Sequence, residues 1–449
     1  MFLLGEQSFL KNSNSSVMTN AKENQKTFAI AFSLAILFPF GGLIYTLRHW
    51  RKEWAKNVFW LICVYMGVVF IYWPEGTMLG DGGDGGRYAL MLVEMYHNPL
   101  VSLTSIFKGY LSDPKIMDLY QPILTYCISR FTYNGHILFT FYAIVFGFFY
   151  SRNIWYVLEK IPNMKIGYFY IFIALYFFVC PISHINGVRM WTALHVYVYA
   201  MMPYLLEKDY SKIWLLLLIP FIHFSFLYIT IFAIIYVFIP YTIKSESTFF
   251  IYFSLIVFII TLFINSINMD FVRIVLQEYT PDVYSGRLNG FVQQEYVERR
   301  IEANSLKNWY VITFSLLKHW VYNILLLLLL PYLKKQLKNS KSMINLYVFT
   351  LLLSSIANLI SLIPSGGRFE FLAQMFKIPM IVLTITSLNQ LDNIFKYVNV
   401  ASILLIFPLI FELRKFFDFY SITLISGNFV TIFFWENNVP IINYIKIFI

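Results

Sequence analysis

The chain has 449 residues, of which 59% are hydrophobic and 13% charged, with a mean hydropathy of +0.64. This composition is that of a polytopic integral membrane protein and excludes an ordinary soluble domain. The net charge of +10 comes from Lys and Arg gathered in short loops, which indicates membrane orientation and not a nucleic-acid interface. The three cysteines lie in apolar segments without metal-ligand spacing, so we expect neither disulfides nor a zinc site.

Apolar stretches follow a polar tail at 1–27, in which no cleavable signal peptide is evident. We expect spans at 28–47, 57–73, 136–158, 166–182, 187–206, 213–241, 249–266, 309–333, 343–363, 368–388 and 394–412. Segment 119–133 is short and carries Pro122 and Arg130, so it should be re-entrant or lie along the outer face. The predicted fold is an all-α polytopic membrane protein with about 11 to 13 transmembrane or re-entrant helices, forming one domain over 28–412.

Positive charge in short loops sets the expected orientation. The loop at 48–56 carries four basic residues and one acidic residue, which places it in the cytoplasm, although lysines of the N-terminal tail argue mildly the other way. The segments 74–118 and 267–308 are then outer loops. The C-terminal segment 413–449 is also expected outside.

This topology depends on the stretch 213–241, which is too long for one ordinary helix and contains Pro220 and His223. If it crosses once, the lysines of 334–341 fall outside. If it enters and returns as two short helices broken near His223, they fall inside, in agreement with the charge rule, and we expect this hairpin. The Gly-rich loop after the second span, the turn at 186–189 and Arg368 then share the extracytoplasmic side.

Arg189 and Arg368 each sit where a loop meets a long apolar stretch. An arginine at membrane depth costs about 2.5 to 3.5 kcal/mol on insertion scales, so it tends to face a cavity or an anionic partner. Its planar guanidinium can donate two hydrogen bonds to one phosphate. The alternatives are snorkelling to lipid headgroups for Arg189 and a structural ion pair with Glu370 for Arg368.

Asp81 and Asp84 lie in the run Gly80–Tyr88, which is rich in glycine and lets the backbone approach a ligand closely. Asp84 is a candidate for catalysis or substrate binding, against the alternative of a solvated loop. Tyr88 follows Asp84 by four residues and would share its face if a helix has begun there, although an interfacial aromatic anchor is the simpler interpretation.

His223 lies at the proposed helix break, and Ser225 follows it by two residues. A histidine there can act as a base or a hydrogen-bond donor, and the alternative is that it caps the break. The other histidines show no spacing typical of metal ligands, so no metal or other cofactor is expected.

The order of these motifs resembles the EpsG family of bacterial exopolysaccharide proteins, relatives of the Wzy-type polysaccharide polymerases. The resemblance covers most of residues 28–412 and rests on Gly82, Asp84 and Tyr88, on Gln121 and Pro122 at an acidic-Pro position, on Asn186, Gly187, Val188 and Arg189, on His223 and Ser225, and on Arg368 and Phe369. This chain departs from the pattern twice. The segment Trp73–Gly76 stands where the family pattern has an arginine, and Gln121 stands where it has a carboxylate. If that carboxylate is essential, either Asp81 takes its place or this member of the family acts differently.

The resemblance implies a fold like that of the GT-C transferases, which act on lipid-linked sugars. It also implies a polysaccharide polymerase at the outer face of the bacterial inner membrane, joining oligosaccharide repeat units carried on undecaprenyl pyrophosphate. Its partners would be this lipid-linked glycan, membrane lipids, a flippase and a chain-length regulator. Two rivals remain: a glycosyltransferase using a polyprenyl-phosphate sugar, and a transporter or flippase for lipid-linked glycans.

In the polymerase scheme, Arg189 and Arg368 neutralise the departing pyrophosphate. Asp84 or His223 removes the acceptor proton. The residues that would position or bind substrate are Tyr88, Asp81, Asn186 and Ser225, beside the two arginines.

Overall fold

The computed structural model describes residues 22–72, 84–98, 100–113, 118–161, 169–267, 274, 278, 302, 307–335, 341–363, 365–388, 393–434 and 439–448. Within these residues the chain is helical, and its β-type pairing consists of two isolated bridges. Six helical segments in this described part of the chain are long and apolar enough to cross a membrane. The prediction of an all-α polytopic membrane protein is therefore confirmed.

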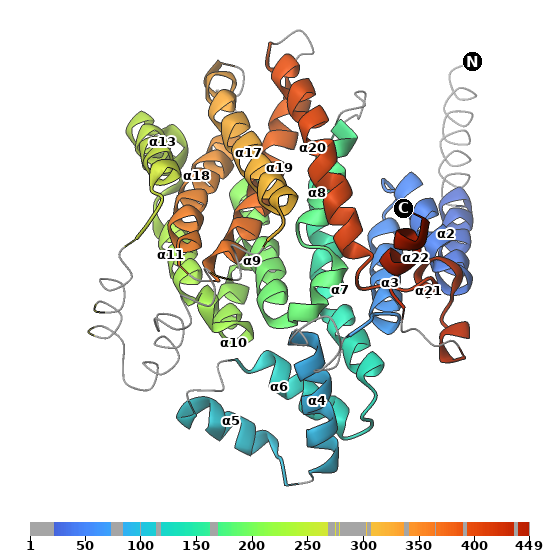
Figure 1. The fold of residues 1–449 in the computed structure, drawn as a ribbon. Coiled ribbons are helices and arrows are strands. Elements are labelled where there is room, and N and C mark those ends of the chain that lie inside the picture. Colours follow the sequence, from blue (N-terminus) through green and yellow to red (C-terminus); the bar gives the residue numbers. More distant parts are fainter. Residues whose placement is uncertain are drawn as a thin grey trace, which may run out of the picture.

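The long helices stand side by side in one bundle (Figure 1). They are α7 (Gly135–Glu159), α8 (Phe169–Val179), α9 (Val188–Glu207), α17 (Trp309–Lys335), α18 (Lys341–Ser361), α19 (Phe369–Ser387) and α20 (Ile394–Phe416). The short helix η1 (Ile182–Gly187) connects α8 to α9. Helices that are apolar on all sides are those that a bilayer or a protein core surrounds. We call the end of the bundle where α7 begins and α8 ends the lower end, as Figure 1 draws it, and the opposite end the upper end.

The first predicted span, 28–47, is wrong as a single crossing. A helix over 22–37 stops at Phe38, and α2 (Pro39–Arg48) then folds back along it. A Cβ added to Gly42 would lie 2.8 Å from the backbone nitrogen of Ala35, whereas seven residues of one straight helix would be about 10 Å apart. Pro39 begins the second helix, a position that proline favours.

Both arms of this N-terminal hairpin meet the loop before α3 (Ala55–Val68). Phe28, near the start of the first arm, lies 6.4 Å from Trp54, and Tyr45, near the end of the second, lies 6.5 Å from it, measured between ring centroids. The start of the first arm, with Lys22 and Lys26, and the basic loop at 48–56 are therefore at the same, upper end. These lysines and the loop then no longer argue for opposite orientations, because both lie at one end of the bundle.

The predicted hairpin over 213–241 is confirmed. It consists of η2 (Ile213–Leu218), α10 (Ile219–Ile222), η3 (Phe224–Phe226) and α11 (Leu227–Phe238), with the break at His223. The Tyr197 hydroxyl donates to the Ile229 carbonyl, and the Tyr204 hydroxyl to the Val237 carbonyl, so α11 runs parallel to α9. Short α12 (Tyr241–Glu246) and then α13 (Thr248–Phe263) follow, and α17 joins α18 at the upper end (Figure 1).

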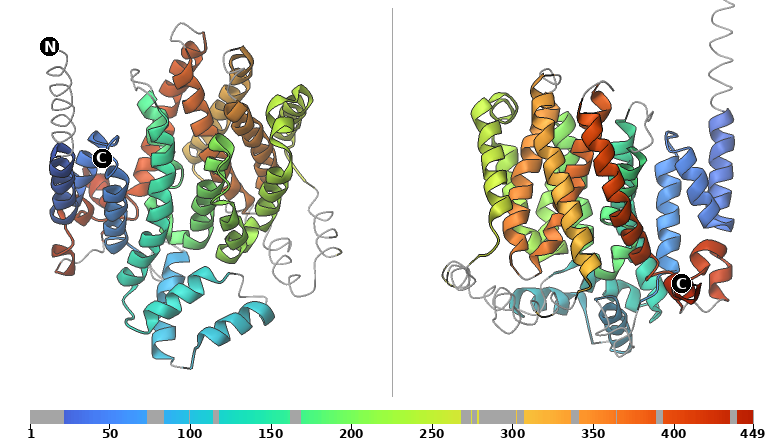
Figure 2. Two further views of the ribbon diagram at one scale, coloured as in Figure 1. Left: turned by 180° about the vertical axis from the view of Figure 1, so that it is seen from behind. Right: turned by 45° about the horizontal axis from the view of Figure 1, so that its top comes forward.

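Three short helices lie beneath the lower end of the bundle in both Figure 1 and Figure 2. They are α4 (Asp84–His97), α5 (Leu103–Ser112) and α6 (Tyr120–Ser129). The predicted outer loop 74–118 thus contains helices, because α4 buries one face, including Tyr88 and Leu92, at helical spacing. Segment 119–133 forms α6 at this end. The predicted loop 267–308 lies almost wholly outside the described residues.

The C-terminal segment follows α20 as α21 (Thr423–Ser426), η5 (Thr431–Phe433) and α22 (Ile441–Phe448). It packs against α3: the Tyr65 hydroxyl donates to the Thr423 carbonyl at 2.6 Å, and the Ile71 amide donates to the Phe419 carbonyl at 3.0 Å. These contacts fix the N-terminal hairpin and α3 beside the end of α20.

Candidate functional site

The Gly-rich segment and the Asn-Gly turn come into contact at the lower end. A Cβ on Gly85 would lie 2.3 Å from Oδ1 of Asn186, and one on Gly187 would lie 3.6 Å from Oδ2 of Asp84. Only glycine at position 85 lets the first turn of α4 approach the turn at the end of η1 so closely. Two motifs that are about a hundred residues apart in the sequence therefore form one surface.

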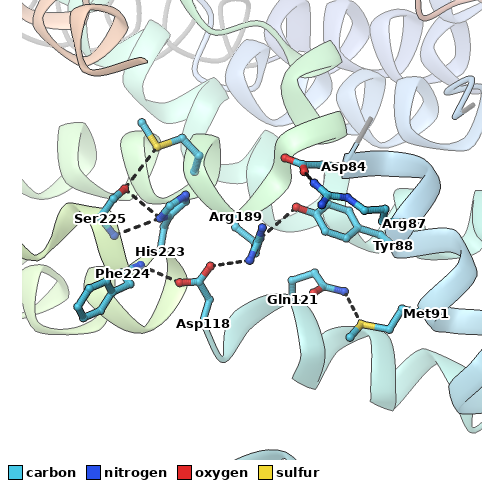
Figure 3. A network of polar contacts seen from close by, with 11 residues as sticks. Asp84, Arg87, Tyr88, Met91, Asp118, Gln121, Arg189, His223, Phe224 and Ser225 are labelled. Atoms are coloured by element: carbon cyan, nitrogen blue, oxygen red, sulfur yellow. Dashed lines mark hydrogen bonds and ion pairs between the residues drawn. The ribbon is translucent and has the colours of Figure 1, made fainter. Parts of the chain in front are cut away.

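Arg189, in the first turn of α9, is held between two side chains, Tyr88 of α4 and Asp118, which precedes α6 (Figure 3). Its Nε donates to the Tyr88 hydroxyl at 3.1 Å, and its NH1 group donates to Oδ2 of Asp118 at 3.0 Å. Burial raises the pKa of Tyr88 to about 12, even though the charge of Arg189 lowers it, so the phenol stays neutral. Arg189 is consequently fixed in direction rather than free to snorkel.

Asp118 is a site residue that the sequence analysis missed. Its side chain is 1% exposed, and its second oxygen, Oδ1, accepts the backbone N–H of Phe224 at 2.7 Å. One carboxylate thus links Arg189 to the broken hairpin. The available signal was its place three residues before Gln121, the position at which the resemblance described above predicts an acid. Gln121 is itself buried and donates to the Thr125 hydroxyl at 2.9 Å.

His223 caps the helical turn that follows the break. Its Nδ1 accepts the backbone N–H of Ser225 at 3.3 Å and lies 3.0 Å from the Ser225 hydroxyl. The capping interpretation describes this contact directly. Because Nδ1 serves as the acceptor, the tautomer that fits is the one with its proton on Nε2, which makes the ring a donor toward the site.

Arg368 comes to the same place from η4 (Gly366–Arg368). Its neighbour Phe369 packs on Phe226, with ring centroids 5.3 Å apart, and the Phe226 ring lies 6.3 Å from the ring of His223. Among the described residues no ion pair involves Arg368.

The alternative pairing of Arg368 with Glu370 is wrong. Glu370 instead accepts from Lys377 at 2.9 Å and lies 3.5 Å from His319. Residues two apart on a helix point about 200° away from each other, which explains why Glu370 faces the bundle interior.

Asp84 begins α4, and its side chain is 23% exposed. One oxygen, Oδ1, binds the guanidinium of Arg87, while Oδ2 lies on the side of Gly187. Asp84 and Tyr88 are on one helix four residues apart, as their spacing predicts if the helix has begun. Asp81 lies outside the described residues.

The lower end therefore gathers the seven described candidates together with Asp118: Asp84, Tyr88, Asn186, Arg189, His223, Ser225 and Arg368. Two guanidinium groups and a ring N–H can bind an anion, and a partly exposed carboxylate can accept a proton. Within the described part of the chain, His, Cys, Asp and Glu side chains form no group of three that could share a metal ion. Compared with protein families, with curated proteins and with solved structures, the chain matches none of them.

Proposed function

We propose that this protein is a polysaccharide polymerase acting at the outer face of a bacterial inner membrane. It joins oligosaccharide repeat units carried on undecaprenyl pyrophosphate. The growing chain moves from its lipid to a hydroxyl of the incoming unit, so that a bond from the anomeric carbon to the pyrophosphate breaks and a glycosidic bond forms. A flippase and a chain-length regulator are the proteins with which such an enzyme works.

The observation that supports this proposal is the position of Arg368, which has no ionic partner among the described residues and whose neighbour Phe369 packs on Phe226 of the broken hairpin that holds His223. Asp118 offsets the charge of Arg189, and Arg368 then adds one positive charge. A pyrophosphate leaving group develops negative charge in a site of low dielectric, where fixed cations stabilise it strongly. This arrangement favours an anionic lipid-linked substrate.

Arg189 still has donors to give to such a substrate. A guanidinium carries five N–H groups; Tyr88 and Asp118 take two, and the other three have no partner among the described residues. Because these partners fix the direction of the side chain, its remaining donors are aimed before the substrate arrives, which lowers the entropic cost of binding.

Asp84 is the residue to which we assign the acceptor proton. Its Oδ2 is not used by Arg87, whereas both oxygens of Asp118 are engaged and Nδ1 of His223 already accepts from Ser225. The N–H of the His223 ring then donates to the departing phosphate, and Tyr88 and Asn186 position the sugar.

The test is a polymerisation assay with the full chain in lipid nanodiscs and purified undecaprenyl-pyrophosphate oligosaccharide. We expect a ladder of products from the wild type. Arg189→Lys and Arg368→Lys should each lose most of it, because lysine keeps the charge but not the planar fork. Arg414→Lys, in an ion pair with Asp418 near the end of α20, is the control.

If each lipid gains only one sugar, the protein is a single-sugar transferase and not a polymerase. If the lipid moves across the membrane and no new bond forms, the protein is a flippase. Full activity of both lysine variants would reduce the two arginines to anchors.

A further inference from the structure

A polar pocket lies at the upper end of the bundle, opposite the candidate site. Its cavity volume is about 180 Å³, and its walls are the start of α3, the end of α7, the second half of α9 and the residue before η2. Its charged lining residues are Lys56 of α3, Arg152 and Glu159 of α7, and Lys212. None of the candidate-site residues lines this pocket, so a ligand bound here would occupy a separate site.

The lining of the pocket has an excess of positive charge, because three of its charged residues are basic and one is acidic. Nζ of Lys56 lies 3.3 Å from Oε1 of Glu159, so these two charges offset each other. Arg152 and Lys212 form no ion pair among the described residues. The wall therefore presents two cations without a paired carboxylate, and both belong to the pocket itself.

Arg152 is held in place by its neighbours. The centre of its guanidinium lies 4.2 Å from the ring centroid of Phe148 and 5.1 Å from that of Trp60. Its NH2 group donates to Oδ1 of Asn57 at 2.7 Å, and its NH1 group donates to the Ser151 hydroxyl at 2.8 Å. The other three N–H groups have no partner among the described residues, so the oxygens of a phosphate can accept them from a guanidinium that is already fixed in direction.

Lys212 is the second cation of the wall. Its Nζ lies 4.5 Å from the ring centroid of Tyr199, which also lines the pocket. An aromatic ring attracts an ammonium group within about 6 Å of its centroid, so this contact holds the long side chain at the pocket. The ammonium group makes no hydrogen bond within the described part of the chain, and its N–H groups are free to bind an anion.

The surroundings of Lys212 indicate where such an anion comes from. Trp214 and Leu217 of η2 follow it closely in the chain and are 59% and 62% exposed. Exposed apolar side chains of a membrane domain face lipid tails, and tryptophan is typical of the boundary between hydrocarbon and water. A phosphate in the pocket can therefore carry lipid tails that lie along η2, whereas a free phosphate ion would contact the cations alone.

We propose that this pocket binds the phosphate group of an anionic lipid in the leaflet at the upper end. Arg152 and Lys212 bind the phosphate oxygens, and basic pockets between transmembrane helices are a known way of binding such headgroups. The inference goes beyond the proposed function, because this lipid is not the substrate and lies at the other end of the bundle. Since Arg152 of α7 is bonded to Asn57 of α3, and Lys212 follows α9, one bound lipid would join the ends of three helices.

The test measures binding of phosphatidylglycerol to the purified full chain in a nonionic detergent by native mass spectrometry. Phosphatidylcholine with the same acyl chains is the comparison without net charge. We expect the first phosphatidylglycerol to bind at least tenfold more tightly. Arg152→Gln should weaken its binding about tenfold, because it removes a charged fork of donors. Lys212→Gln should weaken it about fivefold, as expected for one cation near a membrane surface.

Arg48→Gln is the matched control. It removes the same charge at the same end of the bundle, from an exposed residue at the end of α2 that does not line the pocket. Binding of phosphatidylglycerol to this variant should stay within about twofold of the wild type. If Arg152→Gln fails to insert, the comparison of Lys212→Gln with Arg48→Gln tests the same point.

Three results would overturn the inference. Equal losses in the pocket variants and in Arg48→Gln would show a general attraction of the basic end to anionic lipid. Equal binding of phosphatidylcholine would show that the two cations do not select the lipid. Displacement of phosphatidylglycerol by millimolar inorganic phosphate would assign the pocket to a soluble anion. These measurements do not involve the ladder assay, so the proposed function is tested independently.

Discussion

Asp118 should contribute more to stability than any other carboxylate at the lower end, because it holds two structures at once. Asp118→Asn keeps an acceptor for the N–H of Phe224 but removes the charge opposite Arg189. A hydrogen bond to a charged group contributes about 1.5 to 3 kcal/mol, and since the Arg189 side chain is 29% exposed we expect the lower part, about 1.5 to 2 kcal/mol. Asp118→Ala also leaves the Phe224 N–H unpaired, which brings the loss to about 3 to 5 kcal/mol.

The assay is unfolding of the purified protein by SDS, followed by tryptophan fluorescence, from which the free energy of unfolding is obtained. The double variant Asp118→Asn with Arg189→Gln should be more stable than the sum of the single losses predicts, by about 1 kcal/mol or more. Glu94→Gln, an exposed carboxylate on α4, should stay within about 0.5 kcal/mol of the wild type. Losses that add within about 0.5 kcal/mol would refute the coupling of Asp118 to Arg189.

Two further predictions concern the acceptor proton and the orientation. Asp84→Asn should lower turnover by roughly 100-fold or more while substrate still binds. His223→Asn can still cap the break through its side-chain oxygen and should lower turnover less. The opposite ranking of the two variants would assign the base to His223. For the orientation, single cysteines are introduced in a Cys127→Ser background. A cysteine replacing Thr132 at the lower end should react with an impermeant thiol reagent in intact cells, and one replacing Ser211 at the upper end should not. The reverse labelling would put the candidate site in the cytoplasm.

The long spans and the broken hairpin were predictable because they follow from local properties. Apolar length identifies a helix, and Pro220 together with the lysines at 334–341 identifies the break through the charge rule. The N-terminal hairpin was not predictable in this way. From residue 28 to residue 47 the two arms form one predominantly apolar stretch, in which Pro39 marks the turn, so composition gives the same signal for one crossing as for two short helices.

The candidate site was predictable in its members but not in its connections. Each motif pointed to a loop-helix junction, and the structure brings those junctions together. Asp118 could not be predicted from the sequence, because its partners are distant in the chain: Arg189 is 71 residues away and Phe224 is 106 residues away. No local sequence pattern indicates such contacts. The helices α4 and α5 were hidden in a predicted loop since their apolar faces are short and interrupted by polar residues.

The N-terminal hairpin has a consequence for how the chain can change. Because it starts and finishes at the upper end, the hairpin of residues 22–48 adds an even number of passes, and the rest of the molecule keeps its direction with or without it. A truncation beginning at Arg51, or a fused reporter placed ahead of residue 22, would leave Arg189 facing the same compartment. Orientation is then decided by the charges after residue 48, and the first two helices contribute packing without setting the direction of the chain.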